Sequence, residues 1–101
     1  MPVTDSALVA SVRAGDVDAF RTLVDRHGRM LFRVAHRVTG NKQDAEDVVQ
    51  ETFLRTHREL HRFELRAGVG TWLYRIAVNS AVDHLRSRRR EAEWPEGRRT
   101  V

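Results

Sequence analysis

The chain has 101 residues, 41% of them hydrophobic and 32% charged, a size that fits one domain and a balance that excludes a disordered polyelectrolyte. It contains no cysteine, so disulfide scaffolds, cysteine nucleophiles and thiolate metal sites are excluded, and the cytoplasm is the expected location. Neither an apolar run long enough to span a membrane nor a secretory signal is present, so we expect no membrane partner.

The formal net charge is +4, and the charges are distributed unevenly along the chain. Six arginines lie between residues 86 and 99, whereas the four carboxylates between residues 44 and 51 have no basic residue among them. This polarity suggests two partners of opposite charge preference. The alternative is that both segments are solvated helix faces.

Apolar residues recur with helical spacing, which predicts an all-α fold, a compact bundle of about four helices. The first helix is expected over residues 5–14, where Thr4 or Asp5 can accept hydrogen bonds from free backbone amides and Gly15 can stop it.

The second predicted helix begins after Asp16, which can cap it, and continues to residues 39–41. Gly28 is a candidate break within it. Phe20 lies on its apolar side and is expected to be buried.

The third helix is expected from Asp44, as its cap, to about Leu60. Its inward stripe is predicted to consist of Val49, Phe53, Thr56 and Leu60. The opposite face is predicted to carry Asp47, Gln50, Glu51, Leu54 and Arg58.

That opposite face combines carboxylates with an exposed leucine, an arrangement typical of protein contacts because the leucine supplies buried area and the carboxylates select a basic partner. The alternative is that the early carboxylates only complement the helix dipole. This explanation suits Asp44 and Glu46 but not Glu51, which lies two turns into the helix.

A loop is expected from residue 61 to residue 70, and its glycines allow close backbone approach. Such a loop can receive a flipped nucleotide base, although long loops without this role look similar. The candidate base-binding residues in it are Phe63, Glu64, Leu65, Arg66, Ala67 and Gly68.

The fourth helix is expected from Thr71, as its cap, to about residue 91. Its inward side is predicted to hold Leu73, Tyr74, Ala77, Val78, Ala81 and Leu85, and Ile76 is also expected to be buried. A separate stripe contains Trp72, Arg75, Asn79, Asp83, Arg86 and Arg90. An aromatic ring, an amide and guanidiniums can stack on a base, read its edge and neutralise phosphates, so the stripe favours nucleic acid. The alternative is a Trp72 packed against the loop and solvated arginines.

No enzyme or cofactor signature is found. His57 and His61 have the spacing of two helical zinc ligands but lack the glutamate order of a metalloprotease motif, so we expect neither a metal nor a cofactor. Asp83 and His84 are adjacent in sequence and point to different helix faces, so they are not expected to act as a catalytic pair.

The run from Asp44 to Phe53, then Phe63, the run from Thr71 to Asn79 and the run from Asp83 to Arg86 together resemble region two of extracytoplasmic-function sigma factors. The resemblance covers roughly residues 5–90 and rests on the type, order and spacing of the motifs. It implies a sigma region 2 domain over residues 1–93, followed over residues 94–101 by the start of a linker or a tail.

The resemblance implies three partners. It assigns Asp47, Gln50, Glu51 and Leu54 to the β′ clamp helices of the RNA polymerase core. It assigns the fourth helix and the preceding loop to the single-stranded non-template strand of the minus-ten promoter element, with Asn79 at the upstream edge, Trp72 at the melting fork and a flipped base in the loop. An anti-sigma factor that masks these surfaces is the third partner.

The expected function is therefore promoter recognition and melting by base capture, without enzymatic activity of its own. The alternatives are a sigma-like module that occupies polymerase or an anti-sigma factor without productive DNA binding, and an unrelated basic helical protein that binds duplex. Family members carry a second domain that reads the minus-thirty-five element, and this sequence contains no counterpart of it.

Overall fold

The structure is a computed structural model and describes residues 3–62 and 68–93. These residues form four α-helices and one short 3-10 helix: α1 (Asp5–Arg13), α2 (Val17–Thr39), α3 (Lys42–Glu59), η1 (Leu60–Arg62) and α4 (Val69–Glu93). The predicted all-α fold of about four helices is confirmed. The expected linker over residues 94–101 lies outside the described residues.

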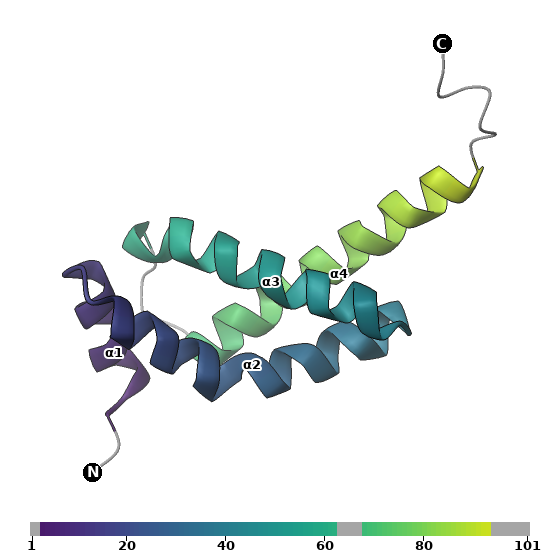
Figure 1. The fold of residues 1–101 in the computed structure, drawn as a ribbon. Coiled ribbons are helices and arrows are strands. Elements are labelled where there is room, and N and C mark those ends of the chain that lie inside the picture. The colour runs from purple at the N-terminus through teal and green to yellow at the C-terminus, as the bar shows by residue number, and fades with distance from the viewer. Residues whose placement is uncertain (1–2, 63–67, 94–101) are drawn as a thin grey trace.

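The helices α2 and α3 run side by side in opposite directions, and α4 packs against both of them (Figure 1). The short α1 packs on α2 and η1 near the N-terminus. The C-terminal part of α4 extends beyond the other helices (Figure 1), so its side chains there face solvent.

The helix starts follow from local capping chemistry. Thr4 accepts a hydrogen bond from the Ala7 amide at 3.1 Å, and Asp16 accepts from the Asp18 and Ala19 amides at 3.0 and 3.2 Å, as predicted. The predicted cap of α3 was wrong. The cap is Asn41, whose side chain accepts from the Asp44 amide at 2.9 Å.

The prediction of Thr71 as the cap of α4 was also wrong. The amide of Trp72 donates to the Gly68 carbonyl at 3.1 Å, so helical hydrogen bonding starts before Thr71. Gly28 does not divide α2, which is continuous over 23 residues. Gly15 and Gly40 have positive φ angles of 98° and 69°, a conformation that glycine adopts without strain, and both follow helix ends as expected.

The core consists of two hydrophobic clusters along the bundle. The larger one contains Leu8, Val9, Ala19, Leu23, Leu31, Leu60, Val69, Leu73 and Ala77. The smaller one contains Ala35, Ala45, Val48 and Ala81. Alanines dominate the smaller cluster, and their small side chains let α2, α3 and α4 approach closely where they cross.

The inward face of α3 differs from the prediction. Val49 and Phe53 are only partly buried, whereas Ala45, Val48 and Thr52 are buried. The face is rotated because α3 must pack against α4 as well as α2. Thr52 can lie inside because its hydroxyl donates to the Val48 carbonyl at 2.7 Å. The predicted burial of Thr56 and Leu60 is confirmed.

Four further burial predictions, one on α2 and three on α4, were wrong. Phe20 is partly buried and meets Phe53 edge to face at 6.3 Å between ring centroids, at the margin of the core. Tyr74 is 48% exposed, and Val78 and Leu85 are partly buried, because the inward face of α4 is centred on Leu73, Ala77 and Ala81. The predicted burial of Ile76 is confirmed.

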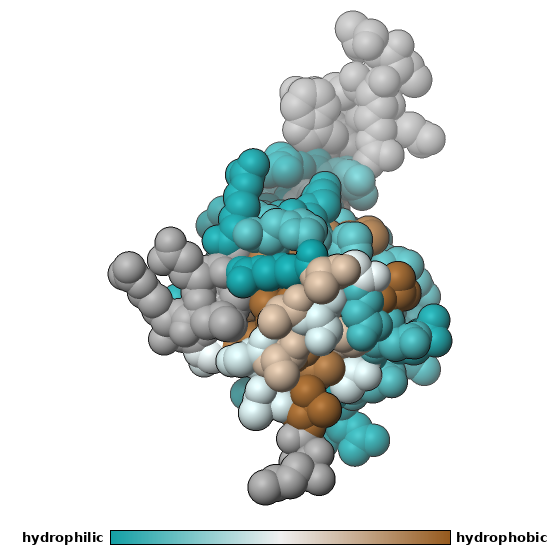
Figure 2. Space-filling model, turned by 90° about the vertical axis from the view of Figure 1, so that its left-hand side faces the viewer, coloured by the Kyte–Doolittle hydropathy of each residue, from teal (hydrophilic) through white to brown (hydrophobic). Residues whose placement is uncertain are grey.

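On the side of the molecule nearest α1, Figure 2 shows hydrophilic side chains above and small apolar patches below them. Among the helices of the described segments, none is both long and apolar enough to cross a membrane.

Candidate protein-binding and nucleic-acid-binding surfaces

The acidic face of α3, defined by Asp47, Gln50, Glu51, Leu54 and Arg58, is exposed at all five positions. It lies opposite the buried residues of the helix, which explains why an apolar side chain there stays in solvent. Leu54 is 58% exposed. The predicted surface therefore exists, and its binding partner stays a prediction.

A shallow groove of about 410 Å³ borders the acidic face, between α2 and α3. Phe32 and Val49 form its apolar part, and Asp47 and Gln50 belong to both the groove and the acidic face. The ring of Phe32 stacks on His36 at 5.8 Å between centroids. The groove is not evident from the sequence, because helical spacing predicts that Val49 lies inside the core.

The stripe on α4 is exposed at Arg75, Asn79, Asp83, Arg86 and Arg90. Its sixth predicted member, Trp72, is only partly exposed, because it packs against the larger core cluster. The stripe thus presents one amide and several guanidiniums along a line, with the indole at its beginning held partly in the core.

Most of the predicted base-binding loop, Phe63 to Ala67, lies outside the described residues. Both residues that flank the loop in the core are buried: Leu60 is 0% and Val69 is 3% exposed. The Leu60 carbonyl also accepts a hydrogen bond from Arg13 Nε at 3.0 Å. Gly68 is exposed at the start of α4. The ends of the loop are therefore fixed by the core.

The N-terminal segment supports the first turn of α4. His27 of α2 lies against Gly70, where an added Cβ would be 3.5 Å from the imidazole Cε1. The same imidazole contacts Asp5 through Nε2 at 2.9 Å, and Arg26 contacts the other oxygen of Asp5 at 3.0 Å. This network connects α1, α2 and the end of the loop.

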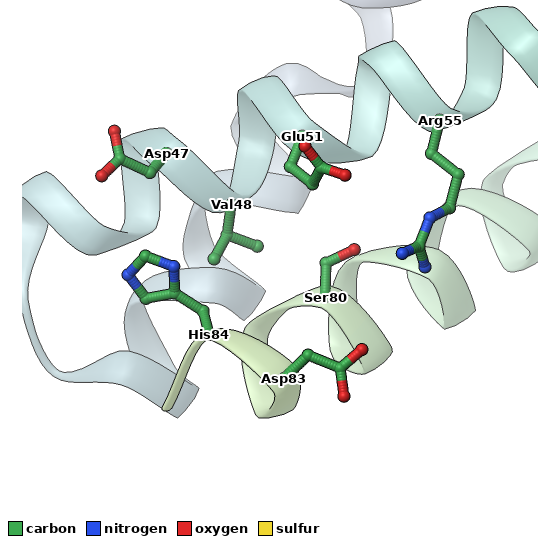
Figure 3. Close-up of a pocket in the computed structure, with 7 residues that line it drawn as sticks. All are labelled: Asp47, Val48, Glu51, Arg55, Ser80, Asp83 and His84. Carbon is green, nitrogen blue, oxygen red and sulfur yellow. The ribbon is translucent and has the colours of Figure 1, made fainter. Parts of the chain in front are cut away.

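A hollow of about 340 Å³ lies between α3 and α4 (Figure 3). It is lined by Asp47, Val48, Glu51, Arg55, Ser80, Asp83 and His84. Two members of the acidic face and one member of the stripe line the same hollow, so the two predicted surfaces meet there. Asp83 and His84 point in different directions (Figure 3).

Beside this hollow, Asp44 joins α3 to α4. It is 6% exposed, and its Oδ1 lies 3.1 Å from His84 Nε2 while its Oδ2 lies 3.7 Å from Arg88 Nε. Although His84 Nε2 and Asp44 Oδ1 are close, the pair lacks the geometry of a hydrogen bond. The sequence reasoning treated Asp44 as a cap and missed this cluster, although the spacing of His84 and Arg88 places both on one face of α4.

Comparison with known proteins places the chain in a family. The model of Sigma-70 region 2 matches residues 23–91. ECF RNA polymerase sigma factor SigW of Bacillus subtilis is 36% identical over 81 residues, which cover 80% of this chain and 43% of the relative. ECF RNA polymerase sigma factor SigM of Mycobacterium tuberculosis is 41% identical over 83 residues, which cover 82% of this chain and 42% of the relative. The chain thus spans less than half the length of these relatives.

Two solved structures share the fold. An engineered region 2 of sigmaE, in complex with GTAAAA, has a TM-score of 0.84 and 39% identity, covering 91% of this chain and 96% of that one. CnrH, in complex with the cytosolic domain of CnrY, has a TM-score of 0.74 and 31% identity, covering 92% of this chain and 68% of that one. The chain therefore belongs to the Sigma-70 region 2 family, and the relatives that it matches are ECF sigma factors.

Proposed function

We propose that this chain binds RNA polymerase and opens promoter DNA, acting in the cytoplasm. The acidic face of α3 docks on the β′ clamp helices of the core enzyme. The stripe on α4 and the preceding loop hold the single non-template strand of the minus-ten element. DNA opening is driven by base capture and uses no nucleotide hydrolysis.

The observation that carries the proposal is the likeness to the engineered region 2 of sigmaE in complex with GTAAAA, which extends over 96% of that chain. The exposed stripe of arginines and Asn79 on α4 supplies groups that can bind a single strand of DNA.

Anchoring of the loop ends in the core favours base capture, because it lowers the entropy cost of binding. Extruding a base from a duplex costs a few kcal/mol, which the protein must return through contacts with the captured base. A loop that has to be ordered on binding returns less, because ordering costs conformational entropy. The buried Leu60 and Val69 hold both loop ends in the core, which lowers that cost.

The polymerase contact is supported by the composition of the acidic face. Leu54 is available for burial in an interface, and Asp47 and Glu51 can steer a basic partner. The neighbouring groove with Phe32 and Val49 gives this face an apolar margin.

The test compares a fluorescent single-stranded minus-ten oligonucleotide with its duplex in a binding titration at low salt. We expect tighter binding of the single strand. Asn79→Ala should relax the base preference at one position, while Ser87→Ala, an exposed change elsewhere on α4, should not. Equal affinity for duplex together with an unchanged preference in Asn79→Ala would contradict the proposal.

A second function is favoured by the likeness to CnrH in complex with the cytosolic domain of CnrY. In this alternative the chain occupies polymerase or an anti-sigma factor without productive DNA binding. Under it, core polymerase binding persists while single-stranded minus-ten DNA shows no binding above that of a scrambled oligonucleotide. For the first function, an anti-sigma factor is a masking partner that competes with polymerase.

A further inference from the structure

The cluster beside the hollow between α3 and α4 has the composition of a metal site. Within residues 3–62 and 68–93, one ligand atom from each of Asp44, Asp47 and His84 lies within 4.8 Å of the other two. Asp44 and Asp47 are one turn apart on α3, and His84 reaches them from α4. The sequence predicts no metal site, because its histidines are scattered and His57 and His61 lack the order of a zinc motif.

The distance between two of the candidate ligand atoms is compatible with zinc coordination. Two ligands at bond lengths of about 2.0–2.1 Å from a zinc ion, separated by the tetrahedral angle, lie roughly 3.3 Å apart. Asp44 Oδ1 and His84 Nε2 are 3.1 Å apart. Asp47 is exposed, so its side chain can rotate towards this pair.

Two buried polar atoms provide independent support. His84 Nε2 is buried and, among the described residues, has no hydrogen-bond partner, so it is available as a ligand. The hydroxyl of Ser80 likewise has no partner there, and this residue is 5% exposed. Ser80 lies one turn before His84 and projects into the hollow (Figure 3).

The charges around the cluster favour a dication. Carboxylates outnumber guanidiniums here, since Glu51 and Asp83 join Asp44 and Asp47 against Arg55 and Arg88. Arg88 holds Oδ2 of Asp44 and leaves Oδ1 to His84, so it orients the carboxylate without occupying the ligand atom. Its side chain is 58% exposed and can move away from the ion.

We propose that Asp44, Asp47 and His84 bind a divalent first-row transition metal of the zinc class, which clamps α3 to α4. An imidazole with two carboxylates suits such a metal better than magnesium or calcium, which prefer oxygen ligands alone. Asp47 belongs both to this site and to the acidic face of α3. The metal site is therefore tested by zinc binding to the chain alone, without polymerase.

The experiment uses Zn²⁺ alone as the probe, titrated into the chain after chelator treatment and followed by calorimetry. We expect one ion per chain. His84→Gln and Asp47→Asn should each lower the affinity about tenfold or more, by analogy with the loss that follows removal of groups around a bound metal. Zinc should raise the Tm of the wild-type chain but not that of His84→Gln.

The matched control is the double variant His57→Gln/His61→Gln, which removes two histidines with the spacing of helical zinc ligands. Both residues are exposed and lie outside the cluster. This variant should change zinc affinity less than about twofold. Circular dichroism establishes that each variant is folded, and Asp47→Asn tests the site even if His84→Gln does not fold, because Asp47 is exposed. Absence of zinc binding to the wild-type chain, or binding lost in the control and retained in Asp47→Asn, would overturn the proposal.

Discussion

Asp44 illustrates how a single residue can hold two helices together. It is almost completely buried at the end of α3 and contacts His84 and Arg88 of α4. A buried carboxylate is stable only when charges or hydrogen bonds compensate its lost hydration. Each of its two oxygens faces one side chain of α4, His84 or Arg88. Asp44 therefore has a role in packing α3 against α4, beyond the capping role that the sequence suggests.

Replacement of Asp44 therefore measures a contact between helices. Asp44→Ala removes the side chain that faces the buried nitrogen of His84 and the Arg88 guanidinium, and is expected to lower the free energy of unfolding by about 1–3 kcal/mol. Urea denaturation with chelator present measures the loss. Asp47→Ala, three residues on and exposed, should stay within about 0.5 kcal/mol. Equal effects of the two changes would argue against a structural role of Asp44.

The structure also changes which apolar side chain is expected to contribute most to stability. Phe53 is partly buried, whereas Leu31 is 0% exposed. Leu31→Ala should therefore cost about 2–5 kcal/mol, and Phe53→Ala less than the roughly 3–5 kcal/mol of a fully buried phenylalanine. Thermal or urea unfolding of both variants checks this order. A larger loss for Phe53→Ala would restore the predicted inward stripe.

At the scale of elements, the turn between α2 and α3 sets how these two helices pair. Gly40 ends α2 with a φ angle of 69°, and Asn41 caps α3 directly afterwards. Because only one residue separates the end of one helix from the cap of the next, the conformation of this turn fixes the register of both helices. The acidic face of α3 depends on that register.

Asn41→Ala removes the side-chain acceptor of the Asp44 amide and is expected to cost about 0.5–2 kcal/mol. Gly40→Ala should cost roughly 1–2 kcal/mol, because an L-residue is strained in the left-handed region. Both effects appear as lower midpoints in urea denaturation. If Asn41→Ala is neutral, the start of α3 does not depend on this cap.

The acidic face of α3 should behave as a contact surface and not as part of the core. Under the proposed function, Leu54→Ala or Gln50→Ala should weaken binding to core polymerase by about 1–3 kcal/mol each if these residues lie centrally in the interface. Unfolding should be unchanged within about 0.5 kcal/mol. Competition for core enzyme measures the first and circular dichroism the second. Thr22→Ala on α2 is an exposed control.

In the whole molecule, the acidic face on α3 and the basic stripe on α4 lie on neighbouring helices. Residues of both surfaces line the hollow between these helices (Figure 3). A uniformly distributed net charge of +4 would attract nucleic acid from any direction. Because the arginines of α4 are separated from the carboxylates of α3, the attraction is directed to the α4 surface. The two partners proposed here can therefore bind at the same time on adjacent surfaces.

This separation predicts the salt dependence of DNA binding. Each phosphate neutralised on a single strand contributes about 0.7 to the slope of log affinity against log salt. Arg86→Ala, on the stripe, should reduce the slope by about that amount and weaken all sequences alike. Arg21→Ala removes the same charge from an exposed position on α2 and should leave the slope unchanged. Identical slopes for the two variants would mean that only the overall charge attracts DNA.

The amino-acid sequence was sufficient to predict the fold class and the positions of the helices to within a few residues. It also predicted the exposed positions of the acidic face of α3 and of the stripe on α4, apart from Trp72. Capping residues such as Thr4 and Asp16, and glycines such as Gly40, act locally, so their effect can be read from their neighbours. The family followed from motifs that the comparisons with known proteins bear out.

Three features could not be predicted without the packed helices: the side of α3 that faces inward, the extent to which Trp72 is covered, and the contacts of Asp44. The physical reason is that α3 packs against both α2 and α4, and the directions of these helices cannot be predicted from the local sequence. Amphipathic spacing identifies an apolar side, but the angle at which that side meets its neighbours is set by their crossing. For the same reason His84 and Asp44, 40 positions apart in the sequence, become neighbours only when α4 crosses α3.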